Sequence, residues 1–265
     1  MAHHEHDHDF HIPGNSLWSP LSCIGVGLLA FGLIAFLHAA SFGVSELVGE
    51  IMMLNGLALT VYGTGKWFMD LVNESRERGF KEKVQVLDIA NRYGMLFFIV
   101  SEAMFFAAFF AAYFFLRGHA FVWPPENIFT LDVALPTINT LLLLTSGATI
   151  TIAHHAIMDK DMLKARTFTL LTFVLGFIFL ALQMVEYSHA LFDMDSGVYG
   201  STFYMLTGFH GFHVLVGSLM LVAVWRRMNK GDFSDKQHFY FEATAWYWHF
   251  VDVVWLGLYL AVYLM

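Results

Sequence analysis

The sequence has a single cysteine, Cys23, which excludes any disulfide within the chain. Charge is also scarce: aspartate, glutamate, lysine and arginine together make up 14% of the 265 residues. Hydrophobic residues reach 57%, and the mean hydropathy is +0.58. Because a soluble globular domain has about a quarter of its residues charged, this composition excludes that class and indicates a membrane protein.

The scarce charges leave long apolar segments between them. A helix needs about 20 apolar residues to cross roughly 30 Å of hydrocarbon. Seven segments reach this length: residues 17–38, 47–69, 87–116, 135–158, 166–191, 199–225 and 239–264. We therefore predict an all-α polytopic membrane protein of seven transmembrane helices, with little chain left for a separate soluble domain.

Lysine and arginine are nearly absent from one side of these spans. Of the 14 lysines and arginines, every one but Arg117 lies in or beside the second, fourth or sixth connection. Basic residues collect on the inner side of a membrane, whereas acidic residues have little influence, so the net charge of −8 does not set the orientation. Seven spans then place the N-terminus inside and the C-terminus outside, and no nucleic-acid partner is expected.

The chain divides unequally along its length. Residues 1–16 contain the run MAHHEHDHDFH, whose irregular spacing predicts a solvated tail rather than a defined metal site. Residues 17–72 form a glycine-rich two-helix unit, residues 73–87 a charged cytoplasmic loop, and residues 88–265 a five-helix unit. Within the last unit, we expect Pro124, Pro125 and Pro136 to exclude helix from the segment WPPENIFTLDVALP.

Ionisable residues interrupt the spans, although membrane segments normally exclude them. The candidates are Glu102, Glu186, His210, His213, His249 and Asp252. A charge at the bilayer centre costs at least about 2.5–3.5 kcal/mol, so such residues usually have a role. Three interpretations stay open: ligands of a metal or haem, an ion pathway, or hydrogen bonds between helices. The histidines lie at different depths, which favours hydrogen bonds between helices, with His210 and His213 approaching His249 and Asp252.

Glu102 lies near mid-depth of its span, 14 residues after Asp88 and 15 before Arg117. No lysine or arginine of the chain lies at that depth to offset desolvation of a carboxylate. We therefore expect a protonated carboxyl that donates a hydrogen bond to a neighbouring helix. This is a structural role; membership of a proton relay is the alternative.

Seven motifs along the chain carry a family resemblance. They are RYGMLFFIVSEAMFF at 92–106, WPPE at 123–126, LPTINT at 135–140, AHHA at 153–156, EYSHA at 186–190, VYGSTFYMLTGFHGFHV at 198–214 and FEATAWYWHFVDVVW at 241–255. In sequence and in order they resemble cytochrome c oxidase subunit III, in its bacterial and mitochondrial haem-a branch. The resemblance runs from about Trp18 to the last helix.

This resemblance implies an accessory, non-catalytic subunit of a proton-pumping oxidase that reduces oxygen with electrons from cytochrome c. The two-helix and five-helix units would form a V whose cleft holds phospholipid. The chain would contain no cofactor, because haem a and copper belong to the partner subunits. It would pack on subunit I in a complex with subunit II, while cytochrome c docks elsewhere on the complex. It would support proton uptake and protect the catalytic subunit from inactivation during turnover.

The resemblance also implies residues that contact lipid. Carried over to this sequence, they are Trp67, Phe68, Asp70 and Glu74, with Arg92 and Arg226 as basic partners. Aromatic rings suit the headgroup level, and arginine can bind a phosphate through two parallel hydrogen bonds. The chain departs from the family at Phe68, where a second tryptophan often stands, so an indole donor is lost there.

Two alternatives remain open for the function. An accessory subunit of a quinol oxidase shares the five-helix unit, but relatives of that kind often lack the first two helices. An independent ion transporter would act in purified isolation instead of copurifying with a haem–copper protein. We expect the protein to cross an inner membrane several times, and we expect that membrane to be a bacterial cell membrane in preference to a mitochondrial one.

Overall fold

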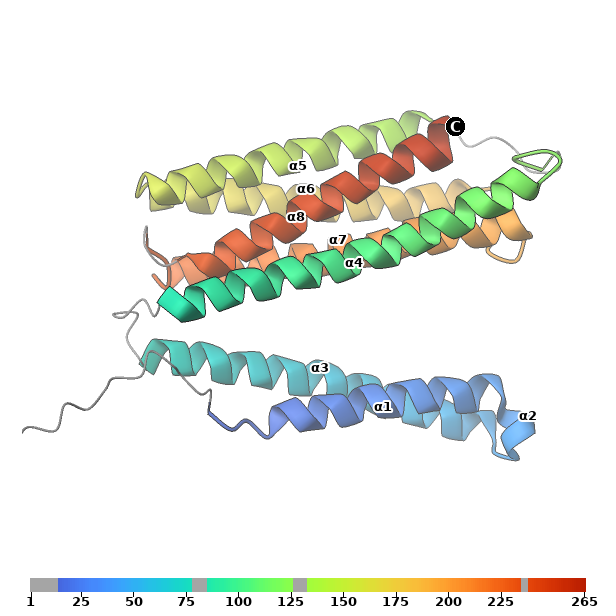
Figure 1. The fold of residues 1–265 in the computed structure, drawn as a ribbon, viewed down its shortest axis with the longest axis horizontal. Helices are drawn as coiled ribbons and strands as arrows, with labels where there is room; N and C mark the ends of the chain where they lie inside the picture. Colours follow the sequence, from blue (N-terminus) through green and yellow to red (C-terminus); the bar gives the residue numbers. More distant parts are fainter. Residues whose placement is uncertain (1–13, 78–84, 126–132, 235–237) are drawn as a thin grey trace, which may run out of the picture. The chain divides into compact units, whose positions relative to one another are not determined.

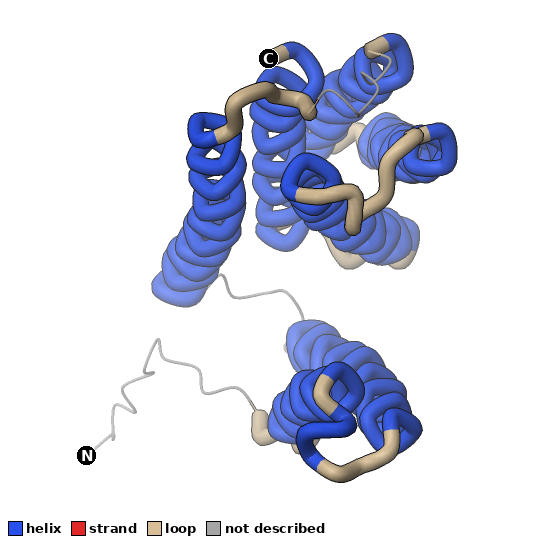
Figure 2. Tube along the Cα trace, turned by 90° about the vertical axis from the view of Figure 1, so that its right-hand side faces the viewer, coloured by secondary structure: helices blue, strands red, loops and turns tan. Residues whose placement is uncertain are grey.

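The structure is a computed structural model that describes residues 14–77, 85–125, 133–234 and 238–265. The described residues form helices joined by short connections (Figures 1 and 2). Seven of these helices are long and apolar enough to cross a membrane. The prediction of an all-α fold with seven spans is therefore confirmed for the described part of the chain, while the histidine-rich run at 3–11 lies outside it.

The chain separates into two compact units, residues 1–87 and 88–265. The first unit contains α1 (Trp18–Leu37), the short α2 (Ala39–Phe42) and α3 (Glu46–Glu77). Helices α1 and α3 pack side by side along their lengths (Figure 1). Gly43 ends α2 in the left-handed conformation at φ 63°, which glycine adopts without steric cost, so the chain can turn into α3.

Glycine lets the backbones of α1 and α3 approach closely. A Cβ atom on Gly32 would lie 2.5 Å from the backbone nitrogen of Met53, and one on Gly56 would overlap the backbone of Leu29. Small residues are the usual means of helix association in membranes, where lipid supplies no hydrophobic drive between helices. The two-helix unit is therefore held mainly by backbone contact.

The second unit contains five long helices. They are α4 (Gln85–His119), α5 (Ala134–Met158), α6 (Met162–His189), α7 (Val198–Asn229) and α8 (Phe239–Leu258), and a π-helical turn (Tyr259–Leu264) continues α8. Helix α5 packs on α6, α6 on α7, α7 on α8, and α8 on α5, so these four close into a bundle. Helix α4 lies outside this ring and reaches it through side chains.

Two tryptophans of α8 fill the interior of the four-helix bundle. Trp248 is fully buried, and its indole nitrogen donates to Ser146 Oγ at 2.9 Å. Trp255 is buried in the same way, and its nitrogen donates to Thr140 Oγ1 at 2.9 Å. A Cβ on Gly217 would come within 2.9 Å of the Trp248 ring, so the large ring fits because α7 has no side chain there.

Two sequence expectations about the connections were wrong. Pro136 lies inside the first turn of α5, because a residue so near a helix start has no N–H partner within the helix to lose. The predicted loop 73–87 is helical at both described ends, since α3 continues to Glu77 and α4 begins at Gln85; residues 78–84 lie outside the described part. Charged residues can extend a helix beyond the hydrocarbon, where hydropathy no longer marks its end.

The close approach of α1 and α3 yields a test with a matched control. Gly56→Val should separate the two helices and destabilise the first unit by about 1–3 kcal/mol, because the new side chain meets the Leu29 backbone. Gly27→Val on α1 has nothing within 4 Å of the new Cβ and should have little effect. Thermal denaturation in detergent-solubilised membranes measures both. Equal behaviour of the two variants would contradict backbone contact as the source of stability.

Candidate functional site

Glu102 and His213 form the central polar contact between α4 and α7. The Oε2 atom of Glu102 lies 2.9 Å from Nε2 of His213, and Nδ1 of His213 lies 2.8 Å from the carbonyl oxygen of Phe209. Rings of Phe106 and Phe209 stand edge-on to the imidazole at centroid distances of 5.0 and 4.6 Å. The pair is thus enclosed by aromatic carbon, with the Glu102 side chain 21% exposed.

The hydrogen bond to the Phe209 carbonyl determines how many protons the Glu102–His213 pair holds. A carbonyl oxygen only accepts, so His213 Nδ1 must carry a hydrogen and donate it. If the imidazole is neutral, Nε2 is an acceptor, and the carboxyl of Glu102 must be protonated and donate. If the imidazole is charged, Nε2 donates to a carboxylate. In either state one proton lies between the two side chains, and the pair as a whole is neutral.

His210 makes a separate contact with α8. Its Nε2 atom donates to the carbonyl oxygen of Val251 at 3.2 Å, and its ring lies 5.0 Å from the ring of Trp255. The residue is fully buried, and its Nδ1 atom has no hydrogen-bond partner. His210 therefore joins α7 to the α8 backbone.

His249 and Asp252 face α5. The Nδ1 atom of His249 is 3.5 Å from Asp252 Oδ2, and its Nε2 atom is 3.3 Å from Thr151 Oγ1. Asp252 also contacts the site of Gly147, where a Cβ would overlap the carboxyl. The expected approach of His210 and His213 to this pair was wrong: their hydrogen bonds go to Val251 and Glu102, because the two faces of α8 meet different helices.

Glu186 lies at the far end of α6, beside Gln183 and Tyr263. The residue is 7% exposed, and its carboxyl lies within hydrogen-bonding reach of Tyr263 and Gln183. The sequence singled out Glu186 alone, and the structure adds Tyr263 from the π-helical turn, which periodicity could not place. This group is distinct from the Glu102–His213 pair.

The two carboxylates among the predicted lipid residues hold the start of the chain instead of projecting freely. Ser16 Oγ donates to Asp70 Oδ2 at 2.7 Å, and the backbone nitrogen of Gly14 donates to Glu74 Oε1 at 3.3 Å. Both bonds tie the entry of α1 to the end of α3. The rings of Trp67 and Phe68 stack at 5.8 Å, and the Phe68 side chain is exposed.

The two predicted basic partners differ in their availability. Arg92 donates to Glu242 on α8 at 2.6 Å and to Asp88 at 3.4 Å, so its charge is already paired. The bond to Glu242 joins the N-terminal part of α4 to the first turn of α8. Arg226 in the last turn of α7 is exposed, and no described residue bonds to it. Arg226 is therefore the cation available to an anionic ligand.

Glu242, the ion-pair partner of Arg92, was not among the residues that the sequence singled out. It lies in the first turn of α8 and is 15% exposed at its side chain. The available signal was an acidic residue inside FEATAW at the same membrane boundary as Arg92. Opposite charges at the same boundary of two spans are candidates for an ion pair.

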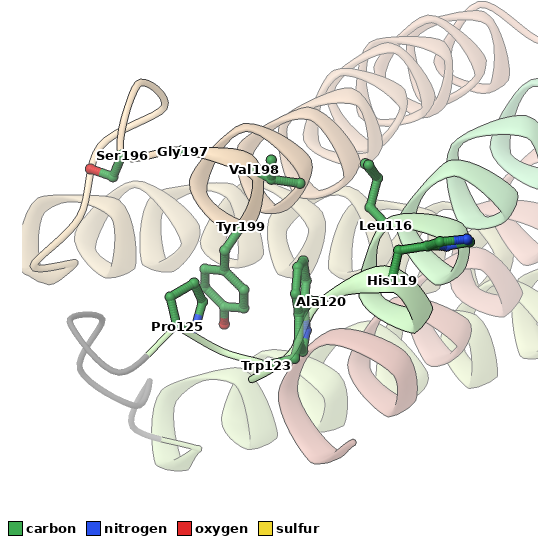
Figure 3. Close-up of a pocket in the computed structure, with 9 residues that line it drawn as sticks. All are labelled: Leu116, His119, Ala120, Trp123, Pro125, Ser196, Gly197, Val198 and Tyr199. Carbon is green, nitrogen blue, oxygen red and sulfur yellow. The ribbon is translucent and has the colours of Figure 1, made fainter.

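A pocket opens where α4 ends and α7 begins (Figure 3). It is lined by Leu116, His119, Ala120, Trp123, Pro125, Ser196, Gly197, Val198 and Tyr199. Trp123 donates from Nε1 to Tyr113 Oη at 3.3 Å, and Tyr113 donates to the carbonyl of Ala261 at 2.9 Å, which fixes the pocket wall to the end of the chain. The lining is mostly apolar, and its ionisable side chains among the described residues are those of His119 and Tyr199.

Metal ligation finds no support in the arrangement of the described residues. No group of three or more histidine, cysteine, aspartate or glutamate side chains lies close enough to hold a metal ion. His154 and His238 come within 5.6 Å by ring centroids but lack a third ligand of these types. These histidine and carboxyl side chains can bind protons and form hydrogen bonds.

Comparison with known proteins gives a consistent result. A sequence model of the family described as cytochrome c oxidase subunit III matches residues 8–265. The chain is 40% identical over 262 residues to cytochrome c oxidase subunit 3 of Marchantia polymorpha, covering 97% of this chain and 96% of the relative. It is 40% identical over 268 residues to that of Ornithorhynchus anatinus, covering 97% of each. It is 42% identical over 264 residues to that of Pylaiella littoralis, covering 97% of this chain and 93% of the relative.

The shared proton of Glu102 and His213 leads to a prediction. Glu102→Leu should destabilise the protein by about 1–3 kcal/mol, because His213 Nε2 loses its buried partner. If the imidazole is neutral and the carboxyl is protonated, Glu102→Gln should remain near wild type, since the amide can still donate to Nε2. Thermal denaturation measures both. A loss as large in the Gln variant as in the Leu variant would instead indicate an imidazolium–carboxylate pair.

Proposed function

Because the chain belongs to the cytochrome c oxidase subunit III family, we propose that it acts as an accessory subunit of a terminal oxidase that reduces oxygen with electrons from cytochrome c. The main observation in support is that its intramembrane polar side chains form hydrogen bonds between helices. The imidazoles of His210, His213 and His249 are directed to oxygen atoms of neighbouring helices. Such a chain provides structure, while haem a and copper reside in partner subunits.

The proposed partners are the catalytic subunit I and subunit II. Large apolar side chains cover much of the outer surface of the five-helix unit, including Phe97, Phe115 and Val253. Such a surface fits lipid and the transmembrane helices of other subunits equally well. The presence of the first unit favours cytochrome c over quinol as the electron donor, since quinol-oxidase relatives often lack these two helices.

Copurification tests the proposed assembly. Affinity capture of the chain from detergent-solubilised native membranes should recover a haem a absorbance band, because a stable subunit remains attached to its complex. After dissociation, the separated chain should contain no stoichiometric iron or copper by elemental analysis. Capture without haem, together with ion flux by the purified chain in vesicles, would favour the independent transporter. A haem of another type would favour a quinol oxidase.

We also propose that the N-terminus faces the inside of a bacterial cell membrane and that the C-terminus faces the outside. The basic residues near the end of α3, the start of α6 and the end of α7 support this orientation. Arg226 and Arg227 end α7 on the proposed inner side, whereas the start of α7 at Gly197 has no basic residue beside it.

Cysteine labelling at the two ends of α7 tests the orientation. In a Cys23→Ser background, Asn229→Cys should react with an impermeant thiol reagent only from the inside, and Ser196→Cys only from the outside. Both positions are exposed, so accessibility within the chain does not limit the reaction. Each variant serves as the control for the other. Reversed labelling of the pair would contradict the orientation.

We propose two lipid contacts, one on each unit. On the first unit, the stacked rings of Trp67 and Phe68 offer an aromatic surface at the end of α3. On the second unit, the exposed Arg226 offers a guanidinium to a headgroup phosphate. Bound phospholipid at these places would support proton uptake and protect the catalytic subunit during turnover.

Arg226→Ala should shorten the working lifetime of the oxidase several-fold while leaving its initial rate nearly unchanged. Losing a charged hydrogen bond of about 1.5–3 kcal/mol weakens phosphate binding by roughly ten- to a hundredfold. Lys230→Ala is the matched control, because Lys230 is an exposed basic residue at the same helix end. Activity is followed to inactivation, and lipid is counted by mass spectrometry. Unchanged lifetime and lipid content in the Arg226 variant would reject this site.

A further inference from the structure

One face of the five-helix unit exposes an ionisable side chain at membrane depth. His249 lies on α8, which runs beside α5 and α4 (Figure 1), 10 residues after Phe239 and 15 before Leu264, where the span begins and ends. At about 1.5 Å per residue, this position is well inside the hydrocarbon. The His249 side chain is 46% exposed, whereas those of Glu102 and His213 are 21% and 5% exposed. The imidazole of His249 is therefore not enclosed by the described part of its own chain.

Small and polar residues lie beside His249. Thr151 Oγ1 on α5 is 3.3 Å from His249 Nε2, and Thr145 and Ala148 are exposed on α5 within two turns of Thr151. Val253, one turn further along α8, is 67% exposed. These five residues define the α5/α8 face. Small side chains on a helix surface let another helix approach closely, which is the usual means of helix association in membranes.

His249 already has a partner for its charge within the chain. Thr151 Oγ1 donates to the carbonyl oxygen of Gly147 at 3.0 Å, so it accepts a hydrogen from His249 Nε2. His249 Nδ1 then faces Asp252 Oδ2 at 3.5 Å, and a charged imidazole is balanced by the Asp252 carboxylate. Whatever covers the α5/α8 face therefore needs no charge of its own, although it meets an imidazole and a hydroxyl.

Lipid acyl chains are a poor match for this face, because they form no hydrogen bonds. Ionisable residues within spans almost always face the interior of a helix assembly or a water-filled cavity. Either surrounding requires more protein over His249 than the described part of this chain provides. The outward surfaces of α6 and α7 differ, since large apolar side chains such as Phe177, Phe212 and Leu219 are exposed there. Those surfaces suit lipid, whereas the α5/α8 face suits protein.

We propose that the α5/α8 face is a subunit interface, covered by a transmembrane helix of another oxidase subunit that places a small or uncharged polar side chain opposite His249. This inference rests on the proposed function, which supplies the partner, and adds the surface on which that partner packs. Thr145 and Ala148 give the incoming helix room to approach, and the imidazole gives it a hydrogen-bonding group at a fixed depth. Such a contact sets the register between the two helices in addition to holding them together.

Photo-crosslinking in the intact complex tests the interface directly. The photoreactive residue p-benzoylphenylalanine is placed at Val253 and, as a matched control, at Leu219, which is also aliphatic and exposed in the middle of a span. Illumination of native membranes should join the Val253 variant to one other polypeptide, identified by mass spectrometry, and the Leu219 variant to none. A Val253 product with lipid alone, with another part of this chain or with a second copy of it would overturn the proposal. Equal polypeptide products at both positions would overturn it too.

The haem a band of the same captured material reports on the proposed function separately. Haem a without a Val253 product would reject the interface and leave the oxidase assignment intact. A Val253 product with a polypeptide of a complex that contains no haem would overturn the assigned partner together with the oxidase assignment.

Side-chain bulk provides an independent test. Val253→Trp should lower the haem a recovered with the captured chain several-fold, because an indole does not fit where a neighbouring helix packs closely. Leu219→Trp is the matched control and should leave the recovery unchanged, since fluid acyl chains adjust to an outward ring. Immunoblotting of each variant in the membrane separates failed assembly from failed folding, and Val253→Met, a smaller increase in size, replaces Val253→Trp if that chain does not accumulate. Full recovery of haem a with the enlarged side chain, at a normal chain level, would reject the interface.

Discussion

The requirement that polar groups find their partners inside the chain governs the five-helix unit. Hydrocarbon offers no hydrogen bonds, so a polar side chain at mid-depth must be paired by another helix or remain costly. Glu102 and His213 meet this requirement together, and the Phe209 carbonyl sets the tautomer of the imidazole. The pair holds one proton and no net charge in either of its two states. It thereby joins α4 to α7 without placing an isolated charge in the membrane.

Helix α4 shows what this requirement does for packing. It lies outside the closed bundle of α5 to α8, and most of its surface is exposed. Polar contacts hold it along its length: Arg92 with Glu242 at one end, Glu102 near the middle, and Tyr113 and Arg117 with the chain's last residues at the other. Aromatic rings such as Phe106 fill the space between them. Each contact also fixes rotation about the helix axis, which apolar packing alone specifies weakly.

The sequence predicted the spans well and the polar partners poorly, for a physical reason. Span length follows from bilayer thickness, and basic residues mark where chains leave the membrane, so both are local properties. A hydrogen-bond partner depends on which face of a helix meets which neighbour. His249 and Asp252 share a face one turn apart, as expected, yet that face meets Thr151 of α5 and not the histidines of α7. Pro136 likewise shows that a residue type excludes a helix only in the interior of that helix.

The two units are held together by different kinds of contact, although both have apolar outer surfaces. In the first, Gly56 brings the backbones of α1 and α3 into contact, and the polar bonds lie at the membrane boundary, where Ser16 meets Asp70. In the second, large aromatic side chains such as Phe179 and Trp255 fill the interior, and polar groups pair among them at depth. Glu186 is one of these groups, and it lies within hydrogen-bonding reach of Gln183 on its own helix and of Tyr263 in the π-helical turn. The second unit thus pairs polar groups between its helices at depth, whereas the polar bonds between the helices of the first unit lie at the helix ends.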